Sequence, residues 1–202
     1  MKDETFDIVC IRWGTKYGHE YVMRLYDQVR AGTTRLHDFI CFTDQPERQD
    51  GIRYEPCFSG SLQGWYQKLG LFKPGVLTRP TLFLDLDVIV TGSLEKFLDW
   101  PCSFGISEDF IWQGFNSSVM FITPGTCPEL YEHFVKDPYV HRKGDQGIIE
   151  EFLPEAKTFP RDWCLSYKAD KVKEKPKDAI VIFHGKPNPP DCDDQWIKEF
   201  WP

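Results

Sequence analysis

Short apolar runs alternate with longer amphipathic stretches along the chain, a pattern typical of strands that alternate with helices. The apolar runs predict strands over residues 6–11, 38–42, 52–55, 81–84, 102–106, 118–122 and 180–183. The amphipathic stretches predict helices over residues 18–32, 64–72, 93–98, 128–135, 145–152 and 193–201. This order of elements predicts an α/β fold with a mostly parallel central sheet flanked by helices.

Length and composition agree with one globular domain. The 202 residues suffice for one substantial core, and 41% of them are hydrophobic. No segment has the composition of a linker, so we expect a single domain over residues 1–202. The most polar run, 168–178, predicts a solvated surface loop.

The charge pattern excludes several classes of partner. The formal net charge is -7, and no block of Lys or Arg has the length of a nucleic-acid or membrane footprint. The first ten residues carry charges where a signal peptide would be apolar, and no apolar run approaches the ~20 residues of a membrane span. We therefore expect a cytoplasmic protein. The seven cysteines show no C-x-x-C spacing, which favours free thiols.

The segment TLFLDLDVIV, residues 81–90, places two carboxylates in an otherwise apolar run. In an extended chain Asp85 and Asp87 point to the same side, where like charges repel and burial is costly. The pair falls at the carboxyl end of a predicted central strand, where open α/β sheets bind ligands. A divalent cation between the carboxylates satisfies these constraints best, whereas the alternative is one turn-capping and one solvated aspartate.

A second segment, VIFHGKPNPP at 181–190, combines a predicted strand end with chemistry suited to a phosphate. His184 can complete a metal site, Gly185 lets a backbone approach a phosphate, and Lys186 supplies a positive charge. The alternative is a partly buried histidine followed by a proline-rich turn.

Four segments together resemble a known family. DLDVIV (85–90), GFNSSVMFI (114–122), GDQGII (144–149) and FHGKPNP (183–189) occur in the order of the corresponding motifs of GT-A fold glycosyltransferases. They are most similar to those of the glycogenin and lipopolysaccharide galactosyltransferase group. The resemblance covers roughly the last two thirds of the chain and implies a GT-A-like fold. It also implies a nucleotide-binding part at about 1–90 and a sugar and acceptor part at about 91–202.

The resemblance also implies a role for each matching residue. The expected ligands of Mn²⁺ or Mg²⁺ are Asp85, Asp87 and His184. The residues expected near the donor phosphates are Lys68, Asp85, Gly185 and Lys186. The nucleotide pocket is expected to be formed by Ile11, Trp13, Gly14 and Tyr17. The residues expected to contact the donor sugar or act in catalysis are Asp109, Asn116, Asp145 and Gln146. For several of them, helix capping, core packing or an ordinary surface charge is the alternative role.

These roles describe hexose transfer from a UDP-sugar to a glycan or another hydroxyl acceptor. The resemblance implies retention at the sugar, either by front-face attack or through a carboxylate nucleophile such as Asp109 or Asp145. A haloacid-dehalogenase-type phosphatase also uses an Asp-x-Asp pair after an apolar strand and is the second hypothesis. A nucleotide- or glycan-binding module without turnover is the third.

Overall fold

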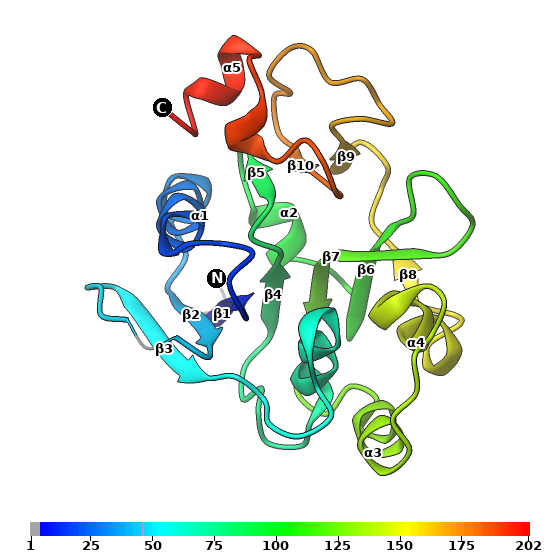
Figure 1. The fold of residues 1–202 in the computed structure, drawn as a ribbon. Helices are drawn as coiled ribbons and strands as arrows, with labels where there is room; N and C mark the ends of the chain where they lie inside the picture. The colour runs from blue at the N-terminus through cyan, green and yellow to red at the C-terminus, as the bar shows by residue number, and fades with distance from the viewer. Residues whose placement is uncertain (1–4, 46) are drawn as a thin grey trace.

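The computed structural model describes residues 5–45 and 47–202, and its centre is a seven-stranded sheet in the order β3-β2-β1-β4-β7-β6-β8 (Figure 1). The strands are β1 (Phe6–Arg12), β2 (His37–Thr43), β3 (Ile52–Pro56), β4 (Thr81–Leu84), β6 (Phe104–Glu108), β7 (Phe115–Ile122) and β8 (Lys157–Thr158). β7 is antiparallel to β4 and β6, and the other pairings are parallel. The predicted α/β class with a mostly parallel sheet is confirmed.

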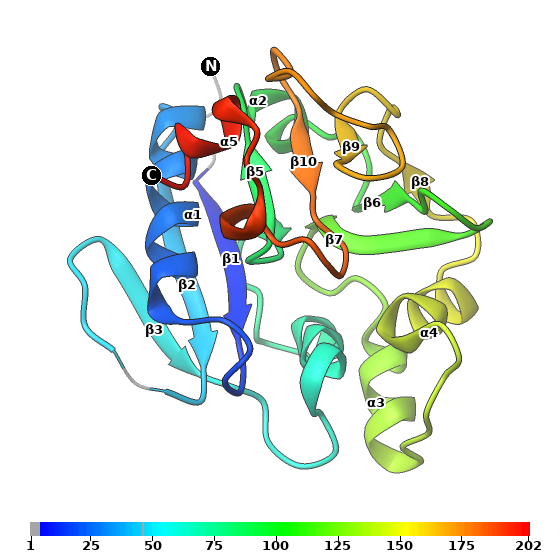
Figure 2. The ribbon, with the colours of Figure 1, turned by 45° about the horizontal axis from the view of Figure 1, so that its top comes forward.

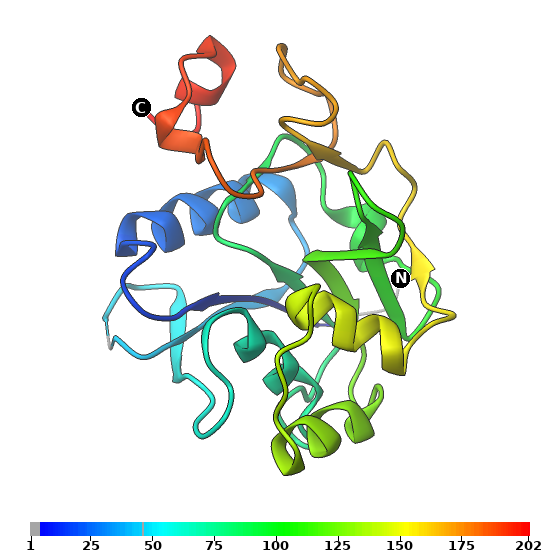
Figure 3. The ribbon, with the colours of Figure 1, turned by 45° about the vertical axis from the view of Figure 1, so that its right-hand side comes forward.

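Helices cover both faces of this sheet because side chains alternate along each strand. Ile8 and Cys10 of β1 pack under α1 (His19–Gly32) and α2 (Glu95–Leu98). Val9 packs on the other face, against the 3₁₀ helix η1 (Gly64–Phe72) and the helices α3 (Pro128–Lys136) and α4 (Gly144–Phe152). Figure 3 shows α1 in blue on one side of the sheet and α3 and α4 in yellow-green on the other.

A second sheet has three strands, the first of which follows β4 directly in the chain (Figure 2). Its strands are β5 (Val88–Val90), β10 (Ile180–Ile182) and β9 (Cys164–Ser166), in the order β5-β10-β9. β5 and β10 are antiparallel, with Val181 opposite Ile89, and the Phe183 N–H donates to the Asp87 carbonyl over 3.0 Å. This pairing brings the segment after Phe183 to the Asp85–Asp87 link between the sheets.

The predicted elements are largely present, with differences at their ends. The predicted strands 102–106 and 118–122 are shifted or extended to Phe104–Glu108 and Phe115–Ile122. The strands β5, β8 and β9 were not predicted. The predicted tail helix 193–201 is present only as α5 (Gln195–Lys198). The chain turns after α5, and the Trp201 ring packs against the Tyr21 ring, with 4.5 Å between the centroids. A further short 3₁₀ helix, η2 (Pro189–Asp191), precedes it.

The structure also bears on the expected state of the cysteines and on membrane-spanning segments. All seven cysteines are free, as expected. Within the two described ranges, no helix has both the length and the apolar character needed to span a bilayer.

We expect Phe97→Ala to lower the free energy of unfolding by about 3–5 kcal/mol, measured by chemical denaturation. Phe97 is fully buried on α2, and its ring lies 5.1 Å from that of Phe159 and 5.2 Å from that of Trp163. The substitution would leave a cavity between α2 and the segment that leads into β9. Leu36→Ala, at a position 75% exposed, is the control and should change stability by less than ~0.5 kcal/mol. Equal effects of the two substitutions would contradict this assignment of the core.

Candidate functional site

Two adjoining cavities meet at the carboxyl end of β4. The larger, about 940 Å³, lies toward β7 and α4, and the smaller, about 460 Å³, lies toward the loop after β1. Both are lined by Trp65, Lys68, Asp85 and Asp87. The aspartate pair therefore stands where the two cavities join, as expected for the ligand site of an open α/β sheet.

Lys68 of η1 is the cation that accompanies Asp85. Its Nζ donates to Asp85 Oδ2 over 2.7 Å and lies 3.8 Å from Asp145 Oδ2. The Ser117 hydroxyl, 3.2 Å from Nζ, donates to the same Asp145 oxygen over 2.6 Å. Burial disfavours the charged amine, but the two carboxylates outweigh it and raise the Lys68 pKa. Lys68 thus stays charged and joins η1 to the ends of β4 and α4.

Asp87 is buried without such a partner. The Tyr17 hydroxyl donates to its Oδ2 over 2.5 Å. Burial and the neighbouring Asp85 raise the pKa of Asp87 to about 6. Burial and the charge of Asp87 raise the Tyr17 pKa, so the hydroxyl stays protonated. Among the described residues no Lys or Arg forms an ion pair with Asp87, although the charges of Lys16 and Lys68 act on it from a greater distance and partly offset the rise in its pKa.

His184 lies on the wall of the larger cavity and is held by its neighbours. Its ring stacks on Phe110, 5.9 Å between centroids, and Nε2 lies 2.7 Å from the Ser166 hydroxyl. Burial and the nearby Lys168 lower the His184 pKa, which favours the neutral imidazole that metals bind. Within residues 5–45 and 47–202, three such side chains do not already converge on one point. The neutral imidazole and two carboxylates on one cavity are nonetheless a donor set that fits Mn²⁺.

The structure brings most of the predicted residues together. The larger cavity is lined by the predicted residues Lys68, Asp85, Asp87, Asp109, Asn116, Asp145, Gln146 and His184. The smaller cavity is lined by the predicted residues Ile11, Trp13, Gly14 and Tyr17. Asp109 also caps its own turn, since Oδ1 accepts the Ile111 and Trp112 N–H groups, each over 2.7 Å.

Gly185 and Lys186 are the exceptions. Neither residue lines the two cavities. The Lys186 side chain is 77% exposed, and its amine pairs with Asp191 over 2.8 Å. The positive charge of the larger cavity comes instead from Lys68, Arg142 and Lys143. Arg142 and Lys143 were not singled out in the sequence, because nothing in their local pattern distinguishes them from surface charges.

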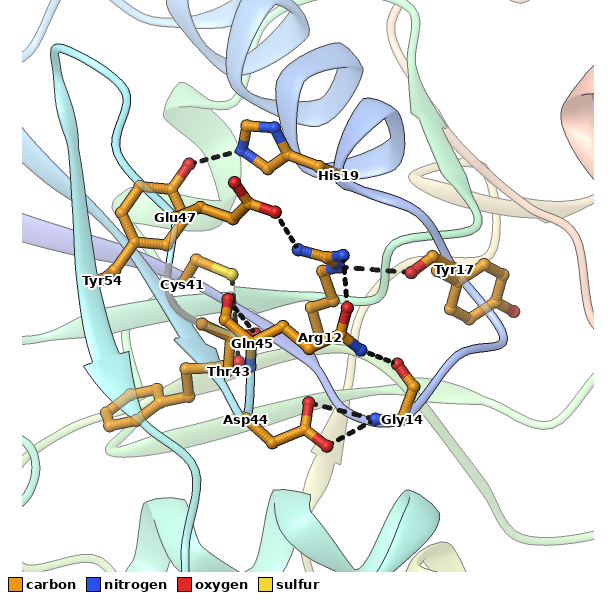
Figure 4. Close-up of polar contacts among 11 residues, drawn as sticks. Arg12, Gly14, Tyr17, His19, Cys41, Thr43, Asp44, Gln45, Glu47 and Tyr54 are labelled. Atoms are coloured by element: carbon orange, nitrogen blue, oxygen red, sulfur yellow. Dashed lines mark hydrogen bonds and ion pairs between the residues drawn. The ribbon is translucent and has the colours of Figure 1, made fainter.

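Sequence reasoning also missed Arg12, a buried arginine that stands in the chain between the cavity-lining residues Ile11 and Trp13 (Figure 4). Arg12 donates to the Tyr17 carbonyl over 3.2 Å, to Gln45 Oε1 over 2.8 Å and to Glu47 Oε1 over 3.3 Å. The Gly14 N–H donates to the Asp44 carboxylate over 3.0 Å. These contacts tie the loop after β1, which carries Tyr17, to the loop after β2. The available signal was an arginine at the end of a strand whose other residues, apart from Asp7, are apolar.

Solved structures of glycosyltransferases share this fold. GlyE of Streptococcus pneumoniae TIGR4 matches with a TM-score of 0.76 and 14% identity, over 98% of this chain and 59% of the GlyE chain. The galactosyltransferase LgtC, in complex with donor and acceptor sugar analogs, matches with a TM-score of 0.68 and 16% identity, over 96% of this chain and 94% of the LgtC chain. The bifunctional glycosyltransferase WbbM matches with a TM-score of 0.66 and 11% identity, over 99% of this chain and 52% of the WbbM chain.

These likenesses confirm the GT-A-like fold that the four sequence segments implied. No family model and no curated protein matches the sequence itself. This chain spans only part of the GlyE and WbbM chains, whereas it corresponds to nearly the full LgtC chain.

We expect Lys68→Met to destabilise the fold by about 3 kcal/mol, because it leaves the buried carboxylate of Asp145 and its neighbour Asp85 without their cation. Urea denaturation at neutral pH measures the loss. The control is Lys198→Met, which removes an exposed pair with Asp193 and should cost less than ~1 kcal/mol. A Lys68→Met protein as stable as the control would show that the amine is not needed to balance the negative charge of Asp85 and Asp145.

Arg12→Met should lower the free energy of unfolding by about 1–3 kcal/mol, because Gln45 and the Tyr17 carbonyl lose their donor. Amide hydrogen exchange should rise in the loop 13–17 and stay unchanged in α3. Arg53→Met, at an arginine whose side chain is 48% exposed, serves as the matched control. Unchanged exchange in the loop would contradict a role for Arg12 in holding it.

Proposed function

We propose that the protein is a glycosyltransferase that moves a hexose from a UDP-sugar to a hydroxyl acceptor with the help of Mn²⁺ or Mg²⁺. The observation that carries the proposal is the junction of two cavities at Asp85 and Asp87. A nucleoside suits the smaller cavity, a sugar suits the polar larger one, and the diphosphate between them would lie at the carboxylates. The fold shared with GlyE, LgtC and WbbM supports the same class of reaction.

The metal would be held by Asp85, Asp87 and His184. When bound, it supplies positive charge that neutralises the diphosphate as the bond to the sugar breaks. Asp87 suits this role because it is buried and its carboxylate has only the Tyr17 hydroxyl as a hydrogen-bond partner among the described residues. Lys68, already charged and paired with Asp85, would add a second positive charge beside the phosphates.

The smaller cavity would take the nucleoside within the nucleotide-binding part, about 1–90. Trp13 or Tyr17 would stack on the base, and Ile11 and Gly14 would line the pocket around it. Trp13 is 39% exposed, so its ring is accessible to a ligand. Gly185 and Lys186 would reach the diphosphate only if the loop after His184 moves toward the cavity, and their role stays a prediction.

The larger cavity would hold the sugar within residues 91–202. Asn116, Asp145 and Gln146 would orient its hydroxyls, and Asp109 would contact it from the opposite loop. Gln146 would act beside Asp145 at the start of α4, where both side chains line this cavity. In transfer, the bond from the anomeric carbon to the phosphate oxygen breaks and a bond to the acceptor oxygen forms. The acceptor proton passes to the departing phosphate in the front-face route.

Asp145 is a poor nucleophile for a retaining route through a covalent intermediate. It is buried, with 5% of its surface exposed, and one carboxylate oxygen accepts the Ser117 hydroxyl while lying near Lys68. Asp109 has one oxygen occupied by two backbone N–H groups. Both are placed to hold hydroxyls, so the front-face route is the mechanism that these contacts favour.

The alternatives differ in what they require. A haloacid-dehalogenase-type phosphatase would need Asp85 as a free nucleophile, whereas Asp85 pairs with Lys68 over 2.7 Å. The fold shared with glycosyltransferases gives that hypothesis no support. A binding module without turnover would use the same cavities, and only the cleavage of a UDP-sugar separates it from an enzyme.

We expect UDP with Mn²⁺ to stabilise the protein by ~2.7 kcal/mol at a hundredfold excess over its dissociation constant. Asp87→Asn and His184→Ala should each weaken Mn²⁺-dependent UDP binding at least tenfold in calorimetry. The double variant should lose clearly less than the sum, because both side chains act through one ion. Asp27→Asn, at an exposed residue of α1, is the control and should bind like the parent protein.

Additive losses, or unchanged Mn²⁺ dependence in His184→Ala, would remove His184 from the metal site. Slow Mn²⁺-dependent hydrolysis of UDP-glucose or UDP-galactose without acceptor is expected of the enzyme. Binding of UDP with no cleavage of any nucleotide sugar would select the binding-module hypothesis instead.

A further inference from the structure

A third hollow, about 420 Å³, adjoins the two cavities on the outer side of Trp65. Trp65 lines all three spaces, and Trp13 lines both this hollow and the nucleoside cavity. The remaining aromatic lining comes from Tyr66, Phe134 and Tyr139. We call this space the aromatic hollow. It lies one side chain away from the place proposed for the donor sugar.

The floor of the aromatic hollow is a packed set of rings. Tyr66 stacks on Phe134 with 4.9 Å between centroids, and Phe134 lies 6.0 Å from Tyr139. The His141 N–H donates to the Tyr66 hydroxyl over 3.0 Å, which fixes that ring to the loop before α4. The hollow is therefore formed by the folded chain, without side chains that must first rearrange.

Its rim consists of large side chains that face solvent. Trp65 is 61% exposed and Val140 is 87% exposed. Gly144, with a φ of +64°, makes room for the Trp65 indole, because a Cβ there would lie 2.9 Å from Trp65 Nε1. Exposed apolar side chains gathered around a hollow mark a ligand or partner surface.

The lining carries no charge, in contrast to the larger cavity, which contains four aspartates, Lys68, Arg142 and Lys143. Its polar groups are hydroxyls and an amide, from Ser61, Gln63 and the two tyrosines. The buried Ser61 hydroxyl has no hydrogen-bond partner in the described part of the chain. Such a surface offers flat aromatic faces beside neutral hydrogen-bonding groups.

We propose that the aromatic hollow is the acceptor subsite and that it takes a neutral saccharide. A pyranose ring presents C–H groups on its faces and hydroxyls at its edge, which matches aromatic rings beside the exposed amide of Gln63. The saccharide would lie on the indoles and extend its reacting hydroxyl past Trp65 toward the donor sugar. This proposal rests on the proposed function for the identity of the reaction, but saccharide binding itself needs no donor.

The test is calorimetric titration of the protein, without UDP or metal, with lactose, maltose, cellobiose and chitobiose, and with the anionic sialyllactose and the alkyl probe octanol. At least one neutral disaccharide should bind and shift the indole N–H signals of Trp13 and Trp65 in NMR spectra. Trp65→Ala should lower that affinity at least tenfold. Val140→Glu, which adds a charge at the rim, should do the same while UDP–Mn²⁺ binding stays unchanged.

Val135→Glu is the matched control, since Val135 is exposed on α3 but does not line the aromatic hollow. It should bind the disaccharide like the parent protein, and circular dichroism should report folded protein for all variants. Preference for octanol or sialyllactose, absence of any disaccharide binding, or equal affinity of Val140→Glu and Val135→Glu would overturn the proposal. If UDP–Mn²⁺ still binds in those cases, the proposed function stands without this subsite.

Discussion

The repulsion between two aspartates at the link between the sheets is the constraint on which the candidate site depends. Asp85 and Asp87 stand between β4 and β5, where apolar strands on both sides restrict access to water. Lys68 balances the first carboxylate, and the Tyr17 hydroxyl contacts the second. Lys68 is the one cation in ion-pair distance of Asp85 and Asp145 among the described residues, and Asp87 has no such partner. The fold thus maintains a local preference for positive charge at the place where the two cavities meet.

The pairing of strands in the second sheet places His184 near these carboxylates. Because β10 pairs with β5 in register, the N–H of Phe183 reaches the carbonyl of Asp87, and His184 follows at the cavity wall. A shift of one residue in this pairing would turn the His184 side chain to the other face. Ser166 of β9 and the ring of Phe110 then hold the imidazole. The histidine position is therefore set by backbone pairing as well as by its own contacts.

The sequence predicted the central sheet and the Asp pair because both depend on local signals, an apolar run and its end. Of the second sheet only β10 was predicted as a strand, and β5 and β9 were missed because each has three residues and pairs with a partner distant in sequence. Arg12 and Trp65 were missed for a related reason. An arginine becomes a buried anchor only when the loop after β2 supplies Gln45 and Glu47, and a tryptophan becomes a shared wall only when three hollows form around it.

The three spaces around Trp65 differ in the charge of their lining residues. Asp85, Asp87 and Lys68 line both the larger and the smaller cavity, whereas no charged side chain of the described residues lines the aromatic hollow, so the proposed diphosphate and its cation would be compensated in the first two spaces. When a neutral ligand covers the aromatic hollow, no charged side chain of its lining loses its water, so there is no desolvation penalty for unpaired charges. A ligand in the aromatic hollow would also cover the exposed face of Trp65 and so shield the junction from water. Lower solvent access would strengthen each electrostatic contact at Asp85 and Asp87, and under the two proposals occupation of the uncharged space would then favour the chemistry at the charged one.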